Sequence, residues 1–255
     1  MLTIRHEQMQ ALQGLAMKGF ENEMIAHARA FSPRLCSVLD EAEIRRAVAF
    51  AIARARAWSF STRGAIRLFI ELALMRGSCF DTDPLCWRIA DVLHEGHGEM
   101  RRARHLHLLS NSYYETVSGP RAINARRALD RMLLFASAPV PIRRDSFTVD
   151  LLRLIHGIYP KKAAYVGDEA LRALIGQGSH AAQQHGFGAR GAVLFVTLMF
   201  AFGHGCCDDP WYPWIARTLT DPRTSGPEAR AARLEKKTRV WLGHVVAGSS
   251  ERLSA

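Results

Sequence analysis

The sequence has no apolar run long enough to cross a bilayer. The longest, Gly191 to Gly203, has 13 residues, whereas a spanning helix needs about 20. We therefore expect a buried core helix there and no membrane insertion. The opening residues MLTIRHE also lack the basic-then-apolar order of a secretory signal, which favours a cytoplasmic location.

Cysteine is scarce as well, with five residues of which Cys206 and Cys207 are adjacent. An odd number with two neighbours is not a disulfide framework. Acidic residues lie near these thiols, but carboxylate and thiolate together suit no single metal, and no C-x-x-C or H-E-x-x-H motif is present. We predict no metal and no other cofactor, and expect the acidic residues to cap helices that begin near Pro84 and Pro210.

Catalytic signatures are missing too. There is no G-x-S-x-G motif, and the glycines from Gly186 to Gly191 lack the Lys-Ser/Thr pair of a phosphate loop. The histidine clusters do not recur at matched positions. We therefore assign no catalytic residue and favour a non-enzymatic protein. A carboxylate-lined enzyme or toxin site, formed between repeats by Asp81, Asp208 and nearby histidines, stays open as the alternative.

What the sequence does contain is helical periodicity, with few strand signals and no Asn-Gly or Asp-Gly hairpin. Residues 41–58 place apolar side chains at steps of three and four, and Asp40 with Glu43 has capping-box spacing. A second helix is predicted over 62–76, capped by Ser61 and ended by Gly77. We predict an all-α protein, with a first helix continuous from about residue 6 to 30.

The chain also contains an internal repeat. A shift of 127 residues (160 − 33) places Pro33 on Pro160 and Phe60 on Phe187. The same shift aligns Arg63-Gly64-Ala65 with Arg190-Gly191-Ala192, Cys79 with Cys206 and Asp81 with Asp208, after which Asp83-Pro84 matches Asp209-Pro210 at a shift of 126. A duplication decides the architecture. We predict two duplicated helical units, 1–119 and 120–255, packed as a multi-helix bundle, with Ala138-Pro139-Val140-Pro141 breaking the lead-in helix of the second.

The charge is strongly basic, at +10 (34 − 24). Arginines are spread along helical stretches without a long basic block or aromatic interleaving, which favours solvated helix faces or an acidic protein partner over nucleic acid. A basic nucleic-acid-binding regulator remains open as a further alternative.

Nine residues are candidates for contacting a partner. The repeated Arg63 and Arg190 start equivalent helices whose far ends are followed by Asp81 and Asp208, a pattern typical of a buried arginine–carboxylate pair or of a recognition surface. Tryptophans often anchor interfaces. The full set is Arg63, Asp81, Asp83, Trp87, Arg190, Asp208, Asp209, Trp211 and Trp214.

One set of residues within the first 95 forms a recognisable pattern: Ile4-Arg5-His6-Glu7-Gln8-Met9, Phe20-Glu21, Met24, His27, Phe31, Pro33, Phe69-Ile70-Glu71-Leu72 and Phe80-Asp81-Thr82-Asp83-Pro84. With this pattern, part of which is repeated over 160–220, the chain resembles a family of small, poorly characterised bacterial helical proteins encoded beside type VI secretion components and their toxic effectors. The family pattern usually has an acidic residue where Gly64 and Gly191 stand. The resemblance implies a non-enzymatic adaptor, chaperone or immunity protein for an effector.

Overall fold

The protein is described by a computed structural model that covers residues 6–138, 142–143 and 145–247. Within these residues every regular element is helical and no strand occurs, so the predicted all-α class is confirmed. The α-helices are α1 (His6–Phe31), α2 (Pro33–Cys36), α3 (Glu41–Ala57), α4 (Arg63–Arg76), α5 (Trp87–His94), α6 (Glu99–Tyr113), α7 (Ile123–Ser137), α8 (Phe147–Ile158), α9 (Pro160–Val166), α10 (Asp168–Gln184), α11 (Ala189–Phe202), α12 (Pro213–Leu219) and α13 (Pro227–Ala247). Three short helical turns are η1 (Pro84–Cys86), η2 (Tyr114–Ser118) and η3 (Pro120–Ala122).

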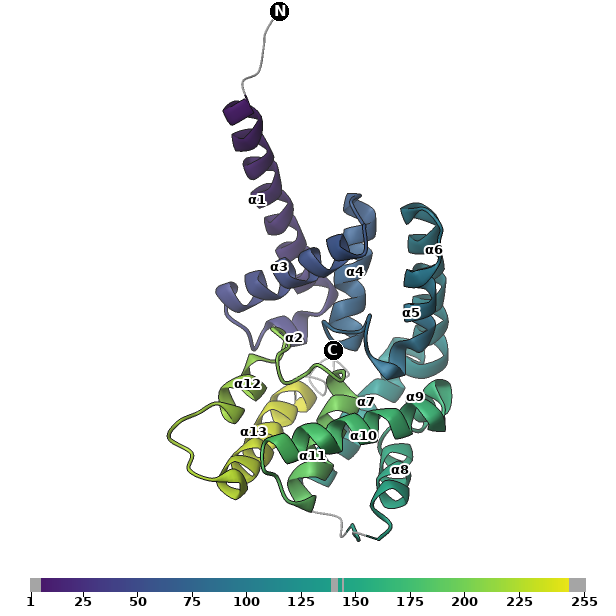
Figure 1. The fold of residues 1–255 in the computed structure, drawn as a ribbon, viewed down its shortest axis with the longest axis vertical. Helices are drawn as coiled ribbons and strands as arrows, with labels where there is room; N and C mark the ends of the chain where they lie inside the picture. The colour runs from purple at the N-terminus through teal and green to yellow at the C-terminus, as the bar shows by residue number, and fades with distance from the viewer. Residues whose placement is uncertain (1–5, 139–141, 144, 248–255) are drawn as a thin grey trace, which may run out of the picture.

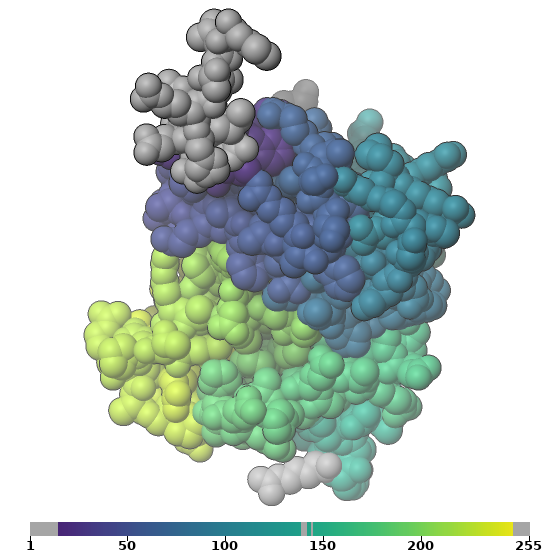
Figure 2. All heavy atoms as spheres, turned by 45° about the horizontal axis from the view of Figure 1, so that its top comes forward, coloured from purple at the N-terminus to yellow at the C-terminus, as the bar shows by residue number. Residues whose placement is uncertain are grey.

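The two halves of the chain lie one above the other, with α1–α6 over α7–α13 (Figures 1 and 2). The first turns of α1 extend beyond the rest of the molecule (Figure 1). Buried apolar residues form one connected cluster that runs from Phe20 in α1 to Leu242 in α13. Because a shared core couples its elements, the two halves form one packed body. None of the described helices combines the length and hydrophobicity that crossing a bilayer requires.

Helix α3 begins as the sequence predicts. Asp40 Oδ1 accepts a hydrogen bond from the Glu43 amide at 2.7 Å, and Glu43 Oε2 accepts one from the Asp40 amide at 2.9 Å, which completes the capping box. Arg217 of α12 donates to the remaining oxygen, Glu43 Oε1, at 2.5 Å. The cap of a first-half helix is therefore also a contact to the second half.

Helix α4 begins differently from the prediction, which was wrong about its cap. Its N-cap residue is Thr62, and neither Thr62 nor Ser61 caps it with a side chain. Instead Glu99, at the start of α6, accepts hydrogen bonds from the amides and hydroxyls of both residues, at 2.7–2.9 Å. A carboxylate near a helix N-terminus accepts hydrogen bonds from the free amides and interacts favourably with the helix dipole. The cap of α4 is therefore supplied by the neighbouring helix α6.

Helix α11 is the centre of the second half. Residues 191–200 are all buried, and its single hydroxyl in that stretch, Thr197 Oγ1, donates to the Val193 carbonyl at 2.7 Å. Gly178 of α10 faces it so closely that a Cβ there would lie 2.6 Å from Val196. The predicted central core helix is confirmed. Its side chains are apolar on nearly every face because every face is buried.

The lead-in helices differ between the halves. Helix α1 is continuous from His6 to Phe31 as predicted, whereas α7 ends at Ser137 and α8 starts at Phe147. The proline segment 139–141, predicted to break this helix, lies outside the described residues. The proposed boundary at 119/120 coincides with a sharp turn, where Gly119, Arg121 and Ala122 all have positive φ, and the division into two units remains a prediction.

The number of residues that separates equivalent positions of the two halves can also be read from the helix bounds. It changes at a different place from the one indicated by the sequence match. Helices α3 and α10 both have 17 residues and start 127 residues apart (168 − 41). Helices α4 and α11 both have 14 residues and start 126 apart (189 − 63). The offset between equivalent positions therefore falls from 127 to 126 before α4 and α11 begin, whereas the sequence match placed this change after these helices. By helix position Arg63 corresponds to Ala189, and the predicted pairing of Arg63 with Arg190 is displaced by one residue.

Candidate functional site

The two halves meet where α4 and α11 end. Both helices stop at a glycine, Gly77 and Gly203, with φ of +92° and +99°. A Cβ on Gly77 would lie 2.3 Å from the Phe202 carbonyl oxygen, and one on Gly203 would lie 2.5 Å from the Arg76 carbonyl oxygen. Only glycine tolerates both this backbone conformation and this approach. The two helix ends are thus in reciprocal backbone contact.

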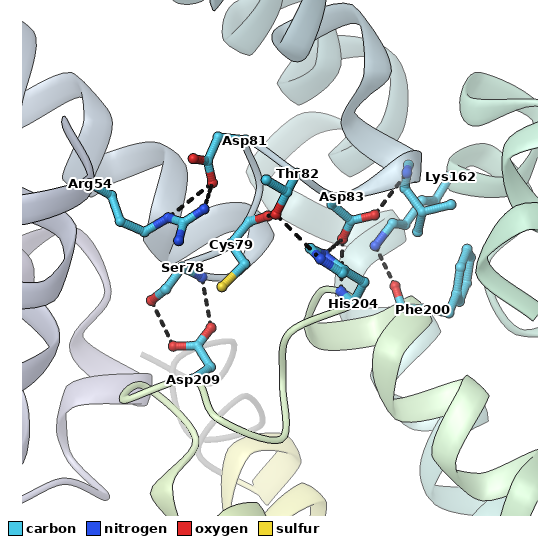
Figure 3. A network of polar contacts seen from close by, with 11 residues as sticks. Arg54, Ser78, Cys79, Asp81, Thr82, Asp83, Lys162, Phe200, His204 and Asp209 are labelled. Atoms are coloured by element: carbon cyan, nitrogen blue, oxygen red, sulfur yellow. Dashed lines mark hydrogen bonds and ion pairs between the residues drawn. The ribbon is translucent and has the colours of Figure 1, made fainter. Parts of the chain in front are cut away.

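Two buried aspartates bind across this contact in a matched way (Figure 3). Asp83 Oδ2 accepts from the His204 amide at 2.8 Å, and Asp209 Oδ2 accepts from the Ser78 amide at 2.7 Å. Each aspartate also accepts a hydrogen bond from the amide two residues further along its own segment, which for Asp83 Oδ1 is the Leu85 amide. We call these aspartates, with Ser78 and His204, the junction.

Asp209 has an additional bond, from the Ser78 hydroxyl to Oδ1 at 2.7 Å, and it accepts from the Trp211 amide at 2.9 Å. Burial raises the pKa of Asp209 above its ordinary value, while the bonds from Ser78 and Trp211 oppose that shift. The predicted capping role of the acidic pair is confirmed at Asp83, which starts η1. Asp209 Oδ1 accepts from the Trp211 amide in the same local way, but no helix begins at Pro210. The next helix, α12, starts at Pro213, so the helix predicted near Pro210 was wrong.

Asp81 is held by α3 and not by the predicted arginine. Its Oδ1 accepts from Arg54 Nε at 3.0 Å and Nη2 at 2.5 Å, and its Oδ2 accepts from Trp58 Nε1 at 2.7 Å. Arg63 instead forms an exposed ion pair with Glu23 of α1. The predicted burial of an arginine–carboxylate pair is correct for Asp81, but the arginine was misidentified.

Arg190 of α11 pairs with Glu235 of α13 at 2.6 Å, and its side chain is 63% exposed. Asp208, its predicted partner, is exposed in the loop after α11. Both arginines at the helix starts are therefore matched to glutamates on a packed neighbouring helix. A carboxylate near such an arginine offsets the unfavourable positive charge at a helix N-terminus.

Two buried cations flank the junction. Lys162 of α9 donates to the Phe200 carbonyl, and burial lowers the pKa of this ammonium to about 8. The Arg76 guanidinium lies 3.3 Å from the centre of the Tyr113 ring. Buried cations need such partners because leaving water is costly. Figure 3 shows Lys162 beside Asp83 and His204.

The cysteines contribute packing near this region. Cys79 lies against Gly205, where an added Cβ would be 2.9 Å from the sulfur. The pKa of the Cys206 thiol is raised, first by its hydrogen bond with Cys207 and then by burial. All five cysteines are unpaired thiols. In the described part of the chain, no group of three or more His, Cys, Asp or Glu side chains has an arrangement that could hold a metal ion.

The nine predicted contact residues thus separate by burial. Four lie in the interior, namely Asp81, Asp83, Asp209 and Trp211. Four are exposed, namely Arg63, Trp87, Arg190 and Asp208, and Trp214 is half-buried against Trp241. A partner could contact these four buried residues only if the two halves separated around them.

Sequence reasoning missed Arg54, Ser78, Lys162 and Glu99, which bind the predicted aspartates or helix ends from distant positions. No periodicity or motif marks these residues. The matched glycine ends could have indicated the junction, since a glycine after an apolar helix is a recognisable stop signal.

Comparisons of this chain with protein-family models, with curated proteins and with solved structures find no match.

Proposed function

We propose that this protein is a non-enzymatic interaction protein: an adaptor, chaperone or immunity protein for a secreted bacterial effector, acting in the cytoplasm on an acidic protein client. The resemblance to helical proteins of type VI secretion clusters motivates the choice of client. The basic charge of +10 suits an acidic partner through electrostatic complementarity.

The single observation that supports this proposal over an enzyme is the state of the carboxylates. Both oxygens of Asp81, Asp83 and Asp209 accept hydrogen bonds from protein donors. Carboxylates bonded on both oxygens in this way hold two chain segments together, whereas a general acid or base must exchange a proton with a substrate. The carboxylate-lined alternative rested on Asp81 and Asp208. Asp81 is held by Arg54 and Trp58, and Asp208 is exposed in the loop after α11. The buried carboxylates are therefore better explained as structural.

We further infer that the two halves descend from a duplicated helical unit. Support comes from the equal lengths of α3 and α10 and of α4 and α11. The turns that end α3 and α10 also match, since the Phe60 amide binds the Ala55 carbonyl and the Phe187 amide binds the Ala182 carbonyl. Each pair of positions is 127 apart.

Affinity capture of the tagged protein from its native host, with mass spectrometry and a parallel nuclease-treated sample, tests the proposal. We expect a specific acidic protein to be retained in both samples. Co-expression with that protein then separates the roles, because an immunity protein relieves toxicity whereas an adaptor does not. Failure to retain any specific protein would count against the proposal, and retention that vanishes with nuclease would favour nucleic-acid binding.

A further inference from the structure

A groove runs along the outer surface between α7 and α8, away from the junction. It has a volume of about 660 Å³ and is lined mainly by apolar side chains. Its apolar lining includes Leu134 and Phe135 of α7, Ile142, and Leu154 and Ile158 of α8.

Positive charge surrounds this apolar lining. Three arginines, Arg131, Arg143 and Arg153, line the groove, whereas Asp150 is the one carboxylate among the lining residues. The lining side chains carry a net charge of +2 (3 − 1), and counting Asp145, which pairs with Arg143, leaves +1 (3 − 2). Charge of one sign around an apolar surface selects a partner of the opposite sign.

The internal contacts of these arginines leave donors available. Arg131 Nη1 donates to the Gly157 carbonyl, a neutral acceptor, at 3.2 Å. Arg153 Nη1 donates to Asp150 Oδ1 at 2.9 Å, and its side chain is 74% exposed. Since a guanidinium has five N–H donors, both can bind an incoming carboxylate. Arg143 is already matched by both oxygens of Asp145.

The apolar lining is also accessible. Leu134 is 69% exposed, one of the most exposed large apolar side chains among the described residues. Gly157 of α8 lies in the groove wall, and a Cβ added there would meet no atom within 4 Å. A side chain from a partner can therefore enter at this position. An apolar groove between two helices can hold the apolar face of a third, amphipathic helix, which is the helix-in-groove mode of recognition.

We propose that this groove binds an acidic amphipathic helix of the client protein. The helix would place apolar side chains on Leu134, Phe135 and Leu154, and its flanking carboxylates on Arg131 and Arg153. Helix α8 has 12 residues, so a matching helix would be about 18 Å long at about 1.5 Å per residue. This inference rests on the proposed function, because it assigns the client's binding site.

The test uses a fluorescein-labelled synthetic peptide of about 14 residues with leucines at helical spacing and glutamates elsewhere. A second peptide replaces each glutamate with lysine. Fluorescence anisotropy then measures binding to the full-length protein. We expect the acidic peptide to bind at least about tenfold more tightly than the basic one, a difference of about 1.4 kcal/mol.

Matched variants locate the binding site. Gly157→Phe fills the groove, and Gly176→Phe is its control, because Gly176 is an exposed helical glycine on α10 where an added Cβ would also meet no atom within 4 Å. Arg131→Glu/Arg153→Glu reverses the charge, with Arg46→Glu/Arg172→Glu as the control at exposed positions of α3 and α10. We expect the groove variants to weaken acidic-peptide binding about tenfold or more and the controls to change it less than about twofold.

The same variants are used in the capture experiment, which separates this inference from the proposed function. If the groove variants retain the client as well as the wild-type protein does, the groove inference is wrong while the proposed function stands. If even the wild-type protein retains no client, both fall. Binding of anionic phospholipid vesicles but not of the peptide, lost in the groove variants, would overturn the helix inference in favour of a membrane surface.

Discussion

Replacing Gly77 with alanine tests whether the backbone contact at the junction stabilises the fold. Two effects add at this position. A non-glycine residue at φ +92° and ψ 152° costs about 1–3 kcal/mol in backbone strain. The new Cβ would also lie 2.3 Å from the Phe202 carbonyl oxygen, and forcing the two segments apart costs a further 1–3 kcal/mol or so. We expect a total loss of about 2–6 kcal/mol, a large share of the roughly 5–15 kcal/mol by which proteins are stable.

Two other glycines separate these effects. Gly167 has a similar conformation, with φ of +85°, but no atom lies within 4 Å of its Cβ position, so Gly167→Ala introduces strain without the clash. Gly64, near the start of α4, has neither a positive φ nor a close neighbour, so Gly64→Ala should be neutral or stabilise by up to about 1 kcal/mol.

Urea unfolding followed by far-ultraviolet circular dichroism measures all three variants. We expect stability to decrease in the order Gly64→Ala, Gly167→Ala, Gly77→Ala. If Gly77→Ala and Gly167→Ala lose the same free energy, the close approach to Phe202 contributes nothing. A loss within about 0.5 kcal/mol of wild type, the usual size of a surface effect, would refute the reasoning for the whole junction.

Two further predictions concern the carboxylates. Desolvation raises the pKa of Glu99, but hydrogen bonds from Thr62 and Ser61 outweigh it and lower the pKa from 4.5 to about 2. The ionised Glu99 therefore stabilises the fold fully above pH 4.5, and this contribution to the free energy of unfolding is lost as the pH falls toward 2. Glu99→Gln should cost about 0.5–2 kcal/mol at neutral pH, and its free-energy difference from wild type should shrink on acidification; a pH-independent difference would contradict this account. Asp81→Ala leaves Arg54 and Trp58 without their acceptor and should lower the free energy of unfolding by about 3–5 kcal/mol. Arg63→Ala removes an exposed ion pair and should lower it by at most about 1 kcal/mol. Equal losses of the two variants in urea unfolding would show that burial does not decide the strength of these pairs.

Local signals in the sequence predicted much of this fold. The capping box at Asp40 and Glu43, the glycine that ends α4 and the apolar circumference of α11 are all where the sequence places them. Each depends on residues within one helix or one turn. Such interactions are set by short-range geometry, so a pattern of types and spacings is enough to identify them.

The pairing of side chains could not be predicted in the same way. Glu99 caps a helix that starts 36 residues earlier (99 − 63), and Asp209 binds Ser78 across 131 residues. The sequence contains several arginines able to satisfy Asp81, and nothing local favours Arg54 over Arg63. Which donor reaches a buried carboxylate depends on how the helices pack, and packing is a property of the whole core.

The one-residue offset between the halves changes how the repeated arginines are interpreted. If Arg63 and Arg190 occupied equivalent positions, their recurrence would favour a shared recognition role. By helix position, however, they are one residue apart, and each is matched by a different neighbour, Glu23 on α1 and Glu235 on α13. Two local charge pairs at helix starts explain both arginines without a common ligand. Arg131 has no carboxylate among its hydrogen-bond partners in the described residues and lies beside exposed apolar surface, so the groove between α7 and α8 is the better place to look for the partner.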